Sequence, residues 1–220
     1  MTDPGLERLS DQISQIRSDQ VDLPLELDDL HPDPFEQFAT WLNEALEAHK
    51  GWPNAMTLAT ADAHGQPSSR IVLLKGIDRR GLSFFTNLGS RKANDLSVNP
   101  HASLTFYWPL QGRQVCIRGP VLRVPDAEAD DYFETRPRSS QLGAWASKQS
   151  SPLASREELE QVVAELDARY PDEVPRPPHW GGFLLEPEAF EFWKSRAGRL
   201  HDRFLYQRQT EDWTITRLNP

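Results

Sequence analysis

Residues 102–124, ASLTFYWPLQGRQVCIRGPVLRV, decide the fold class. The run Ala102–Trp108 is rich in leucine and aromatic residues, which is typical of a short strand. Gln114–Val124 indicates a longer strand that is bent or bulged at Gly119-Pro120, because glycine and proline both interrupt a regular ladder. Apolar strands of this length and spacing favour an antiparallel sheet.

Short runs of the same kind recur on both sides of this stretch. Turn residues separate them, as at Asp62–Gly65, Asp78–Gly81 and Asn99-Pro100. The pattern is typical of an antiparallel barrel or sandwich. We therefore expect further strands at Ala55–Thr60, Arg70–Lys75, Leu82–Asn87, Trp180–Leu185, Phe190–Trp193, Arg203–Gln207 and Trp213–Leu218.

Helices are expected around this sheet. Asp33-Pro34 offers an N-cap followed by proline at the first helical position, and apolar residues then repeat at helical spacing through His49. Further helices are expected at Ser90–Val98, Asp126–Thr135 and Ser155–Arg169, with a proline-rich connector at Pro171–His179. The predicted fold class is mainly β with peripheral helices, in a single barrel-type domain over residues 33–220.

The acidic charge of the chain is concentrated at its N-terminus. The formal net charge is −9 over 220 residues, yet residues 1–50 hold 12 acidic side chains against Arg8, Arg17 and Lys50. Residues 1–32 are also polar and punctuated by proline, so we expect a flexible arm there. The acidic total argues against nucleic acid as a partner, because non-specific binding needs a basic surface.

The sequence argues against several classes of protein. The single cysteine, Cys116, allows no internal disulfide and suggests a reducing compartment. No apolar run reaches the roughly 20 residues of a membrane span, and the first residues lack the features of a signal peptide. We expect a cytoplasmic protein without a membrane partner. No phosphate-loop, GxSxG, HExxH or CxxC motif occurs, and the scattered histidines predict no metal site.

Three groups of cations could bind an anionic ligand. Ser90-Arg91-Lys92 follows a strand at a predicted helix start, which suits a phosphate but equally a capped surface helix. The segment 136–141, with Tyr132 one turn earlier, could clamp a phosphate or could neutralise a helix C-terminus. Arg199, His201 and Arg203 alternate, so in an extended segment they would face one way; a surface strand with Asp202 paired to a neighbour is the alternative.

Longer stretches of the chain resemble the pyridoxine/pyridoxamine 5′-phosphate oxidase family from about Asp33 to Pro220. The matching segments are SSRIVLLK (68–75), FFTNLGSRKANDL (84–96), NPHASLTFYW (99–108), RQVCIRG (113–119), YFETRPRSSQLGAWASKQS (132–150), PPHWGGF (177–183), EFWKSRAGRLHDRFLYQR (191–208) and WTITRLNP (213–220). The resemblance implies a split β-barrel that forms a homodimer, with FMN at the subunit interface. It also implies oxidation of pyridoxamine or pyridoxine 5′-phosphate to pyridoxal 5′-phosphate by O2, with release of hydrogen peroxide.

The resemblance also implies roles for individual residues. The residues expected to bind FMN are Arg70, Ile71, Val72, Leu73, Leu74, Lys75, Phe85, Thr86, Arg91, Lys92, Gln114, Gln149, Ser150, Trp193 and Arg203. Those expected to bind the substrate are Lys75, Tyr132, Arg136, Ser140, Arg199 and His201, of which Arg199 and His201 are the expected catalytic pair.

The chain departs from the family pattern at a few positions. Gln20 stands three residues after Arg17 where a tyrosine is expected, so Gln20 receives no site role. Phe85 replaces a frequent tyrosine, and Gly198 replaces a larger polar residue. Two other functions stay open: a flavin oxidase of the phenazine-biosynthesis type, and a flavin- or pyridoxal-phosphate-binding protein without turnover.

Overall fold

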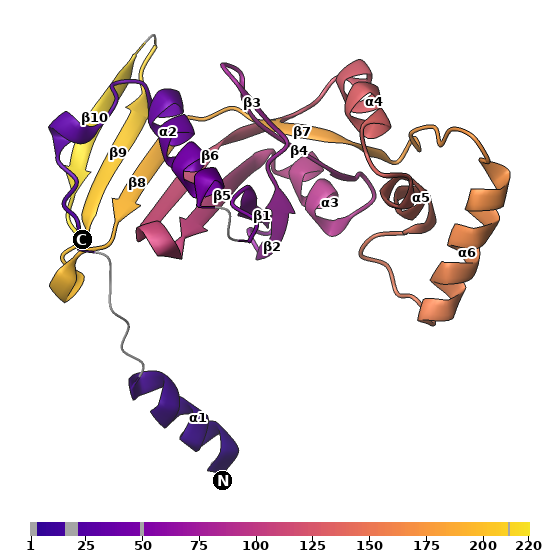
Figure 1. The fold of residues 1–220 in the computed structure, drawn as a ribbon, viewed down its shortest axis with the longest axis horizontal. Coiled ribbons are helices and arrows are strands. Elements are labelled where there is room, and N and C mark those ends of the chain that lie inside the picture. The colour runs from indigo at the N-terminus through magenta and orange to yellow at the C-terminus, as the bar shows by residue number, and fades with distance from the viewer. Residues whose placement is uncertain (1–3, 16–21, 49–50, 211) are drawn as a thin grey trace.

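The computed structural model describes residues 4–15, 22–48, 51–210 and 212–220. The described strands form a ten-stranded antiparallel sheet that curls into a split barrel with helices at its periphery, so the expected fold class is confirmed (Figure 1). The strands are β1 (Ala55–Ala61), β2 (Pro67–Leu73), β3 (Gly76–Asp78), β4 (Gly81–Asn87), β5 (His101–Trp108), β6 (Arg113–Arg123), β7 (Trp180–Leu185), β8 (Ala189–Lys194), β9 (Asp202–Arg208) and β10 (Trp213–Leu218).

Strand β6 connects the two parts of the sheet. Its first half pairs with β5 and β8, whereas Val121–Arg123 pairs with β7. The strand changes partners at Gly119-Pro120, the position where the sequence predicted a bend or bulge. A Cβ atom at Gly119 would lie 1.9 Å from the carbonyl oxygen of Glu186, so only glycine allows this approach of the two backbones.

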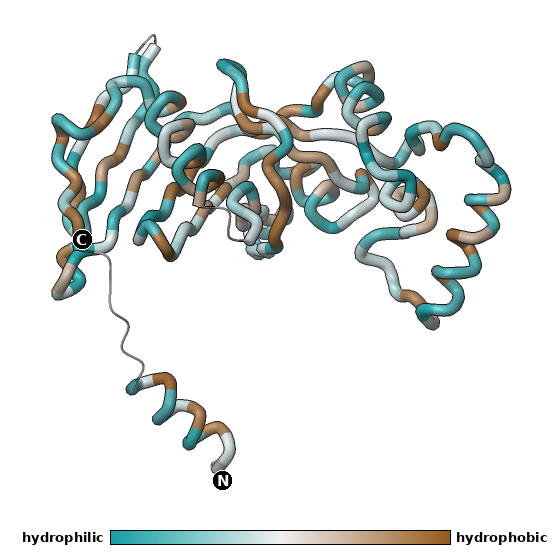
Figure 2. Tube along the Cα trace, in the orientation of Figure 1, coloured by the Kyte–Doolittle hydropathy of each residue, from teal (hydrophilic) through white to brown (hydrophobic). Residues whose placement is uncertain are grey.

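Helix α2 (Pro34–Glu47) covers the inner face of the sheet and closes the main core. It begins as predicted, because the Asp33 carboxylate accepts a hydrogen bond from the backbone N–H of Phe35 at 2.8 Å. Phe38 and Trp41 of α2 then pack edge-on against Phe106 and Phe192 of the sheet. Hydrophobic and hydrophilic residues alternate along several strands (Figure 2), and β1 and β5 bury every second residue, most of them in this core.

A second, smaller lobe beside the sheet is built by the helices α4 (Asp126–Glu134), α5 (Arg138–Ala146) and α6 (Arg156–Arg169) (Figure 1). The other described helices are α1 (Pro4–Gln15) and α3 (Arg91–Val98), with short 3-10 turns η1 (Leu27–Asp29), η2 (Pro109–Gln111) and η3 (Ala197–Arg199). Phe133, Leu142, Leu166 and Trp180 form the core of this lobe. None of the described helices is long and apolar enough to span a bilayer.

The structure differs from the predicted elements at several points. Helix α5 and strand β3 were not expected, and β2 spans Pro67–Leu73 instead of Arg70–Lys75. Helix α5 follows directly on Pro137 and is weakly amphipathic, so apolar spacing alone did not reveal it. The predicted end of α2 at His49 lies outside the described residues.

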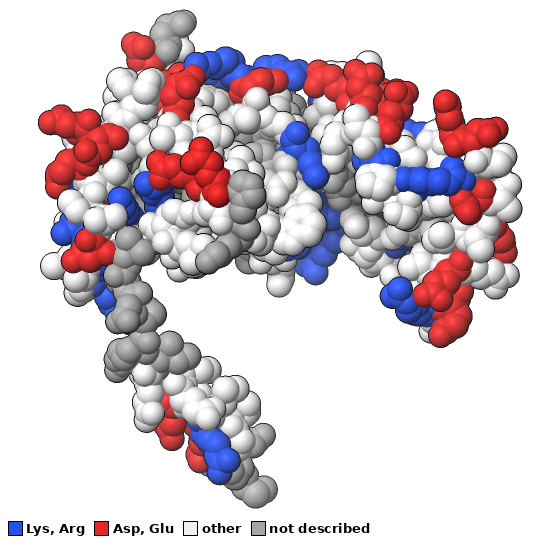
Figure 3. All heavy atoms as spheres, viewed as in Figure 1, with Lys and Arg blue, Asp and Glu red and all other residues white. Residues whose placement is uncertain are grey.

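The chain makes its first contacts with the barrel before the boundary expected at residue 32. Leu25 and Leu30 are buried in the main core, and the backbone N–H of Leu25 donates to the Asp202 carboxylate at 3.1 Å. The described side chains of α1 are exposed. Asp and Glu side chains dominate the outer rim of the view in Figure 3, whereas Lys and Arg also gather in its middle, between the sheet and the helical lobe.

Candidate active site

A pocket of about 1160 Å³ opens between the sheet and the helical lobe. Strands β2 and β4 supply one wall, and α3, α4, α5 and the loop after α5 supply the others. Most of the residues predicted from sequence line it: Arg70, Ile71, Val72, Leu73, Lys75, Phe85, Thr86, Arg91, Lys92, Tyr132, Arg136, Ser140, Gln149 and Ser150. The fold thus brings predicted residues separated by up to 80 positions, Arg70 and Ser150, into one cavity.

Arg70 is held at one end of the pocket by hydroxyl groups. Its guanidinium donates to Thr60 Oγ1 at 2.8 Å and to Ser68 Oγ at 2.5 Å. Both hydroxyls also donate to the buried carboxylate of Asp95, at 2.6 and 2.9 Å, while Arg70 Nη2 lies 3.9 Å from that carboxylate. Burial lowers the pKa of Arg70, Asp95 opposes this shift, and nearby Arg91 adds to it.

Lys92 lies in the same end of the pocket with its ammonium group buried. Nζ donates to Gln149 Oε1 at 2.7 Å, to Thr86 Oγ1 at 3.0 Å and to Ser90 Oγ at 3.2 Å. All three partners are neutral. Burial, followed by repulsion from Arg70, lowers the pKa of Lys92 to about 8. Lys92 and Arg70 therefore form a desolvated cationic pair that an anion would stabilise.

The loop after α5 is tied to the start of α3. The backbone N–H of Arg91 donates to Ser150 Oγ at 3.2 Å, and Ser150 has a left-handed φ of 73°. Asn87 Nδ2 donates to the carbonyl of Ser147 at 2.9 Å. Asn87 and Ser147 line the pocket but were not predicted as site residues. Asn87 adjoins the predicted Thr86 in sequence, which is the one signal that pointed to it.

Arg136 forms the other end of the pocket. Its guanidinium carbon lies 4.7 Å from the ring centroid of Trp180 and 5.4 Å from that of Phe133. Nη1 is buried and has no hydrogen-bond partner among the described residues. Burial lowers the pKa of Arg136. An unsatisfied buried N–H is costly, so this guanidinium is poised for an anion that supplies the missing acceptor.

Aromatic rings form a wall of the pocket beside Arg136. Phe85 stacks on Tyr132 at 4.3 Å and on Trp180 at 5.4 Å, and Lys75 Nζ lies 5.8 Å from the Tyr132 ring centroid. Gly182 permits this arrangement, because a Cβ there would lie 2.7 Å from the Phe85 ring. Trp180 was not predicted as a site residue, although it adjoins the two glycines of the PPHWGGF segment.

A second group of predicted residues lies outside this pocket. Gln114, Trp193 and Arg203 are direct cross-strand neighbours on β6, β8 and β9. Arg203 forms an ion pair with Glu191 at 2.8 Å, and the rings of Trp193 and His201 are 4.6 Å apart. Leu74, predicted to contact the cofactor, is buried and does not line the pocket either.

The extended row expected at Arg199, His201 and Arg203 is wrong for its first member. Arg199 ends the 3-10 turn η3 with a left-handed φ of 63°, and β9 begins only at Asp202. Asp202 pairs with Arg196 and Arg217, as the alternative interpretation expected, but it is buried and does not lie on a surface strand. The positions of Arg17 and Gln20 lie outside the described residues.

Comparisons with known proteins agree on one family. The family described as pyridoxamine 5′-phosphate oxidase matches residues 42–170, and the pyridoxine 5′-phosphate oxidase C-terminal dimerisation region matches residues 180–220. A pyridoxine/pyridoxamine 5′-phosphate oxidase of Paraburkholderia phymatum is 53% identical over 197 residues, which cover 89% of this chain and 93% of the relative. The oxidase of Bordetella pertussis is 55% identical over 188 residues, covering 85% of this chain and 89% of the relative.

Solved structures share the same architecture. PhzG from Burkholderia lata, determined in complex with tetrahydrophenazine-1-carboxylic acid, is similar with a TM-score of 0.86 and 37% identity, covering 92% of this chain and all of that one. An FMN-binding protein from Nostoc punctiforme is similar in fold, with a TM-score of 0.71 at 18% identity, covering 87% of this chain and 100% of that one.

Proposed function

Because this chain belongs to the pyridoxamine 5′-phosphate oxidase family, we propose that it oxidises pyridoxamine 5′-phosphate and pyridoxine 5′-phosphate to pyridoxal 5′-phosphate, using FMN and O2. One observation carries the proposal: a single pocket holds two separate sets of desolvated cations with stacked aromatic rings beside one of them. Two phosphorylated aromatic molecules in contact would satisfy both sets.

The Arg70 end of the pocket fits the phosphate of FMN. Arg70, Arg91 and Lys92 converge there, and the neutral partners of Lys92 leave its buried charge uncompensated. The backbone N-terminus of α3 faces the same end, which favours an anion. Thr86, Gln149 and Ser150 add neutral hydrogen-bonding groups. A phosphate dianion would supply the missing negative charge.

The Arg136 end fits the phosphate of the substrate. The partnerless Nη1 of Arg136, the hydroxyls of Tyr132 and Ser140 and the ammonium of Lys75 all belong to this side of the pocket. Binding a phosphate that does not itself react provides free energy for holding the reacting carbon in place. Arg136 and its neighbours therefore act in orientation rather than in bond breaking.

The second group of predicted residues would reach the pocket from another copy of the chain. Trp193, Arg203 and Gln114 share one sheet patch, and the C-terminal segment that carries two of them matches a dimerisation region. We propose a homodimer in which this patch of each protomer closes the pocket of the other. Arg199 and His201 would then lie against the bound substrate.

FMN held there would supply the redox chemistry: two electrons would pass from the substrate to O2, which yields hydrogen peroxide, and with the amine substrate water would hydrolyse the imine product and release ammonia. The chain's own contribution is to bind both phosphates and to position a proton carrier. His201 Nδ1 accepts a hydrogen bond from the backbone N–H of Arg196 at 3.1 Å. This leaves Nε2 of His201 to exchange a proton with the substrate, while Arg199 supplies positive charge.

A spectroscopic titration tests the proposal. The purified protein should be yellow, and anaerobic addition of pyridoxamine 5′-phosphate should bleach its flavin absorbance, with colour returning on admission of O2. Binding without bleaching would instead indicate a carrier without turnover.

A second candidate function follows from the similarity to PhzG, namely oxidation of a larger aromatic acid that lacks a phosphate. The buried Arg136 guanidinium favours the phosphorylated substrate. Bleaching by a tricyclic aromatic acid but not by pyridoxamine 5′-phosphate would reverse this preference.

A further inference from the structure

A second pocket, of about 600 Å³, lies beside α2 and shares no lining residue with the candidate active site. Residues 24–32, the middle of α2 and the ends of β6 and β8 form its walls. Nothing in the proposed reaction uses these residues. We call it the Lys194 pocket and define it by Leu25, Asp29, His31, Trp41, Arg113 and Lys194.

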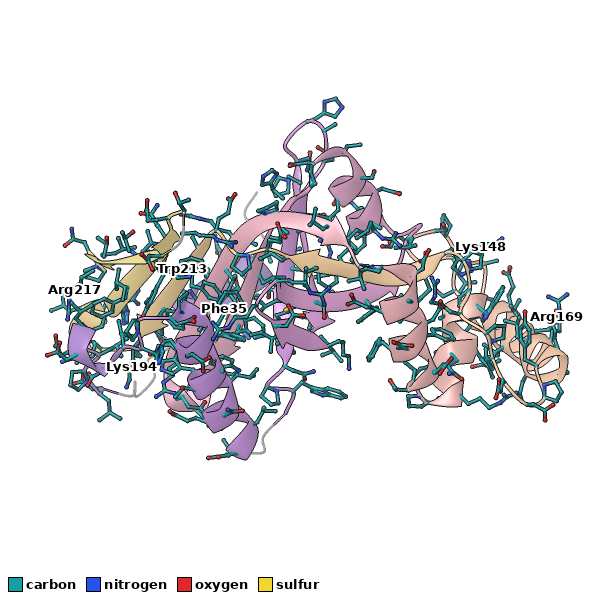
Figure 4. The ribbon with its side chains drawn as sticks, turned by 90° about the horizontal axis from the view of Figure 1, so that it is seen from above. Phe35, Lys148, Arg169, Lys194, Trp213 and Arg217 are labelled. Carbon is teal, nitrogen blue, oxygen red and sulfur yellow. The ribbon has the colours of Figure 1, made fainter. Side chains whose placement is uncertain are left out.

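Lys194 is the unusual member of this pocket. It is the last residue of β8 and pairs in register with Arg113 of β6 and Asp202 of β9. Lys194 is only 8% exposed, yet its ammonium group makes no hydrogen bond or ion pair with any of the described residues. In Figure 4 it projects from the sheet on the side of α2 and η1. The atoms that are both fully buried and unpartnered do not include Lys194 Nζ, so the ammonium is open to the pocket, where an anion could supply an acceptor.

The carboxylates near Lys194 are committed to other groups. Asp202 accepts from Arg196, from Arg217 and from the backbone N–H of Leu25. Glu44 pairs with Arg113 Nη1 at 2.5 Å. Asp29 accepts from the backbone N–H of Glu26 at 2.8 Å. These carboxylates therefore act on Lys194 only through longer-range electrostatic attraction. Burial, followed by repulsion from Arg113, lowers the pKa of Lys194.

Arg113 is the second incompletely satisfied cation of the pocket. Its guanidinium carbon lies 4.5 Å from the Trp41 ring centroid, and its Nε is buried without a hydrogen-bond partner among the described residues. Arg113 and Lys194 are thus adjacent across two strands and line the same cavity, which Asp29 and Glu44 also line; Arg113 pairs with Glu44 through Nη1, but its Nε lacks an acceptor. Two cations side by side favour a shared anion over either one alone.

We propose that the Lys194 pocket binds a small anionic metabolite through its carboxylate or phosphate group, with Lys194 as the main partner and Arg113 as the second. The size of the pocket admits a molecule of several heavy atoms as well as an inorganic ion. Because residues 24–32 form one wall, an occupant would also fasten this segment to the barrel. The proposal is independent of the reaction at the other pocket.

Isothermal titration of the flavin-saturated protein tests the proposal, with inorganic phosphate and acetate as the two probes at constant ionic strength. Bound FMN fills its own phosphate site, and an Arg136→Ala background removes the main anchor for phosphate in the substrate site. On this background we expect one remaining site. Phosphate binding alone would assign the occupant as a phosphate compound, and acetate binding as a carboxylate.

Lys194→Gln should weaken this remaining site by about tenfold or more, as expected for loss of a charged hydrogen bond. Lys194→Arg should retain most of the affinity, whereas Arg208→Gln, at an exposed arginine outside the pocket, should leave it unchanged. Circular dichroism establishes that each variant is folded. Absence of any anion site on the Arg136→Ala background, or equal affinity in Lys194→Gln, would overturn the proposal.

Discussion

Arg136 lies over the indole ring of Trp180, 4.7 Å from the ring centroid, with its Nη1 buried and unpartnered by any residue that the structure describes. This relationship fixes a guanidinium at one end of the pocket before any ligand arrives. Arg136→Ala should raise the KM for pyridoxamine 5′-phosphate by at least about tenfold, since a charged hydrogen bond contributes roughly 1.5–3 kcal/mol. Steady-state kinetics measure the change, and FMN content should stay at one per protomer. Loss of FMN with an unchanged KM would contradict the assignment.

The pH dependence of FMN binding should report on Lys92. Its pKa is lowered to about 8 by burial and by Arg70, so the ammonium loses its proton above that pH in the absence of FMN. Binding a dianion requires the charged form, so the dissociation constant should rise by up to about tenfold per pH unit above 8. Fluorescence titration of the apoprotein between pH 7 and 10 measures this.

A Lys92→Met control should bind FMN weakly at pH 7 and show a much flatter profile. Whereas the lowered pKa of Lys92 makes FMN binding weaken as pH rises, it makes the contribution of Lys92 to the free energy of unfolding increase. Because the unfolded chain keeps the ordinary lysine pKa of 10.5, it binds more protons above about pH 8, and this group then favours folding as pH rises. A wild-type FMN affinity that stays constant to pH 10 would remove Lys92 from the phosphate site.

Asp95 should act through Arg70 and not by contact with FMN. Its carboxylate accepts from Thr60 and Ser68, whose hydroxyls in turn accept from Arg70. Asp95→Ala should lower the free energy of unfolding by roughly 1–3 kcal/mol and weaken FMN binding, because the buried Thr60 hydroxyl and the half-buried Ser68 hydroxyl lose their acceptor. Asp95→Asn keeps an acceptor but removes a negative charge, so FMN should bind at least as tightly as in wild type.

Thermal unfolding and FMN titration of both Asp95 variants separate the two effects. Equal weakening of FMN binding in Asp95→Ala and Asp95→Asn would show that the charge of Asp95, not its position as an acceptor, matters.

The sequence predicted those parts of the fold that local chemistry determines. The N-cap at Asp33 depends on residue types at neighbouring positions and occurs as expected. At Gly119-Pro120, where these residue types predicted a bend or bulge, β6 passes from pairing with β8 to pairing with β7. Helix α5 was missed, because its face is defined by packing against α6, which comes later in the chain. Local periodicity contains no information about such a partner.

The candidate site was predictable only through the family resemblance. Around Arg136, the cation cluster alone did not distinguish a phosphate site from a helix C-terminus neutralised by arginines. Arg136 lines the pocket, whereas Arg138, two residues later, binds the end of α6. Asp95 and Trp180 were not predicted as site residues, because Asp95 acts through a tertiary contact with Ser68 and Trp180 through one with Arg136.

Arg138 provides the matched contrast to Arg136. Its guanidinium donates to the Asp167 carboxylate at 2.6 Å and to the carbonyls of Asp172 and Tyr170, so it holds the C-terminal end of α6 against the start of α5. Because the ion pair with Asp167 is partly exposed, Arg138 stabilises the fold mainly through its hydrogen bonds to the carbonyls. Arg138→Ala should lower the free energy of unfolding by roughly 1–3 kcal/mol, and Arg138→Lys should recover only part of it, since lysine lacks the planar fork.

The kinetic effect of Arg138→Ala should be smaller than that of Arg136→Ala. Arg138 does not line the pocket, so it can influence the substrate only through the position of α5, which carries Ser140. Thermal unfolding and KM, measured on both variants, should therefore rank them in opposite order: Arg138→Ala with the larger loss of stability, and Arg136→Ala with the larger rise in KM. The reverse ranking would mean that Arg138, rather than Arg136, holds the substrate phosphate.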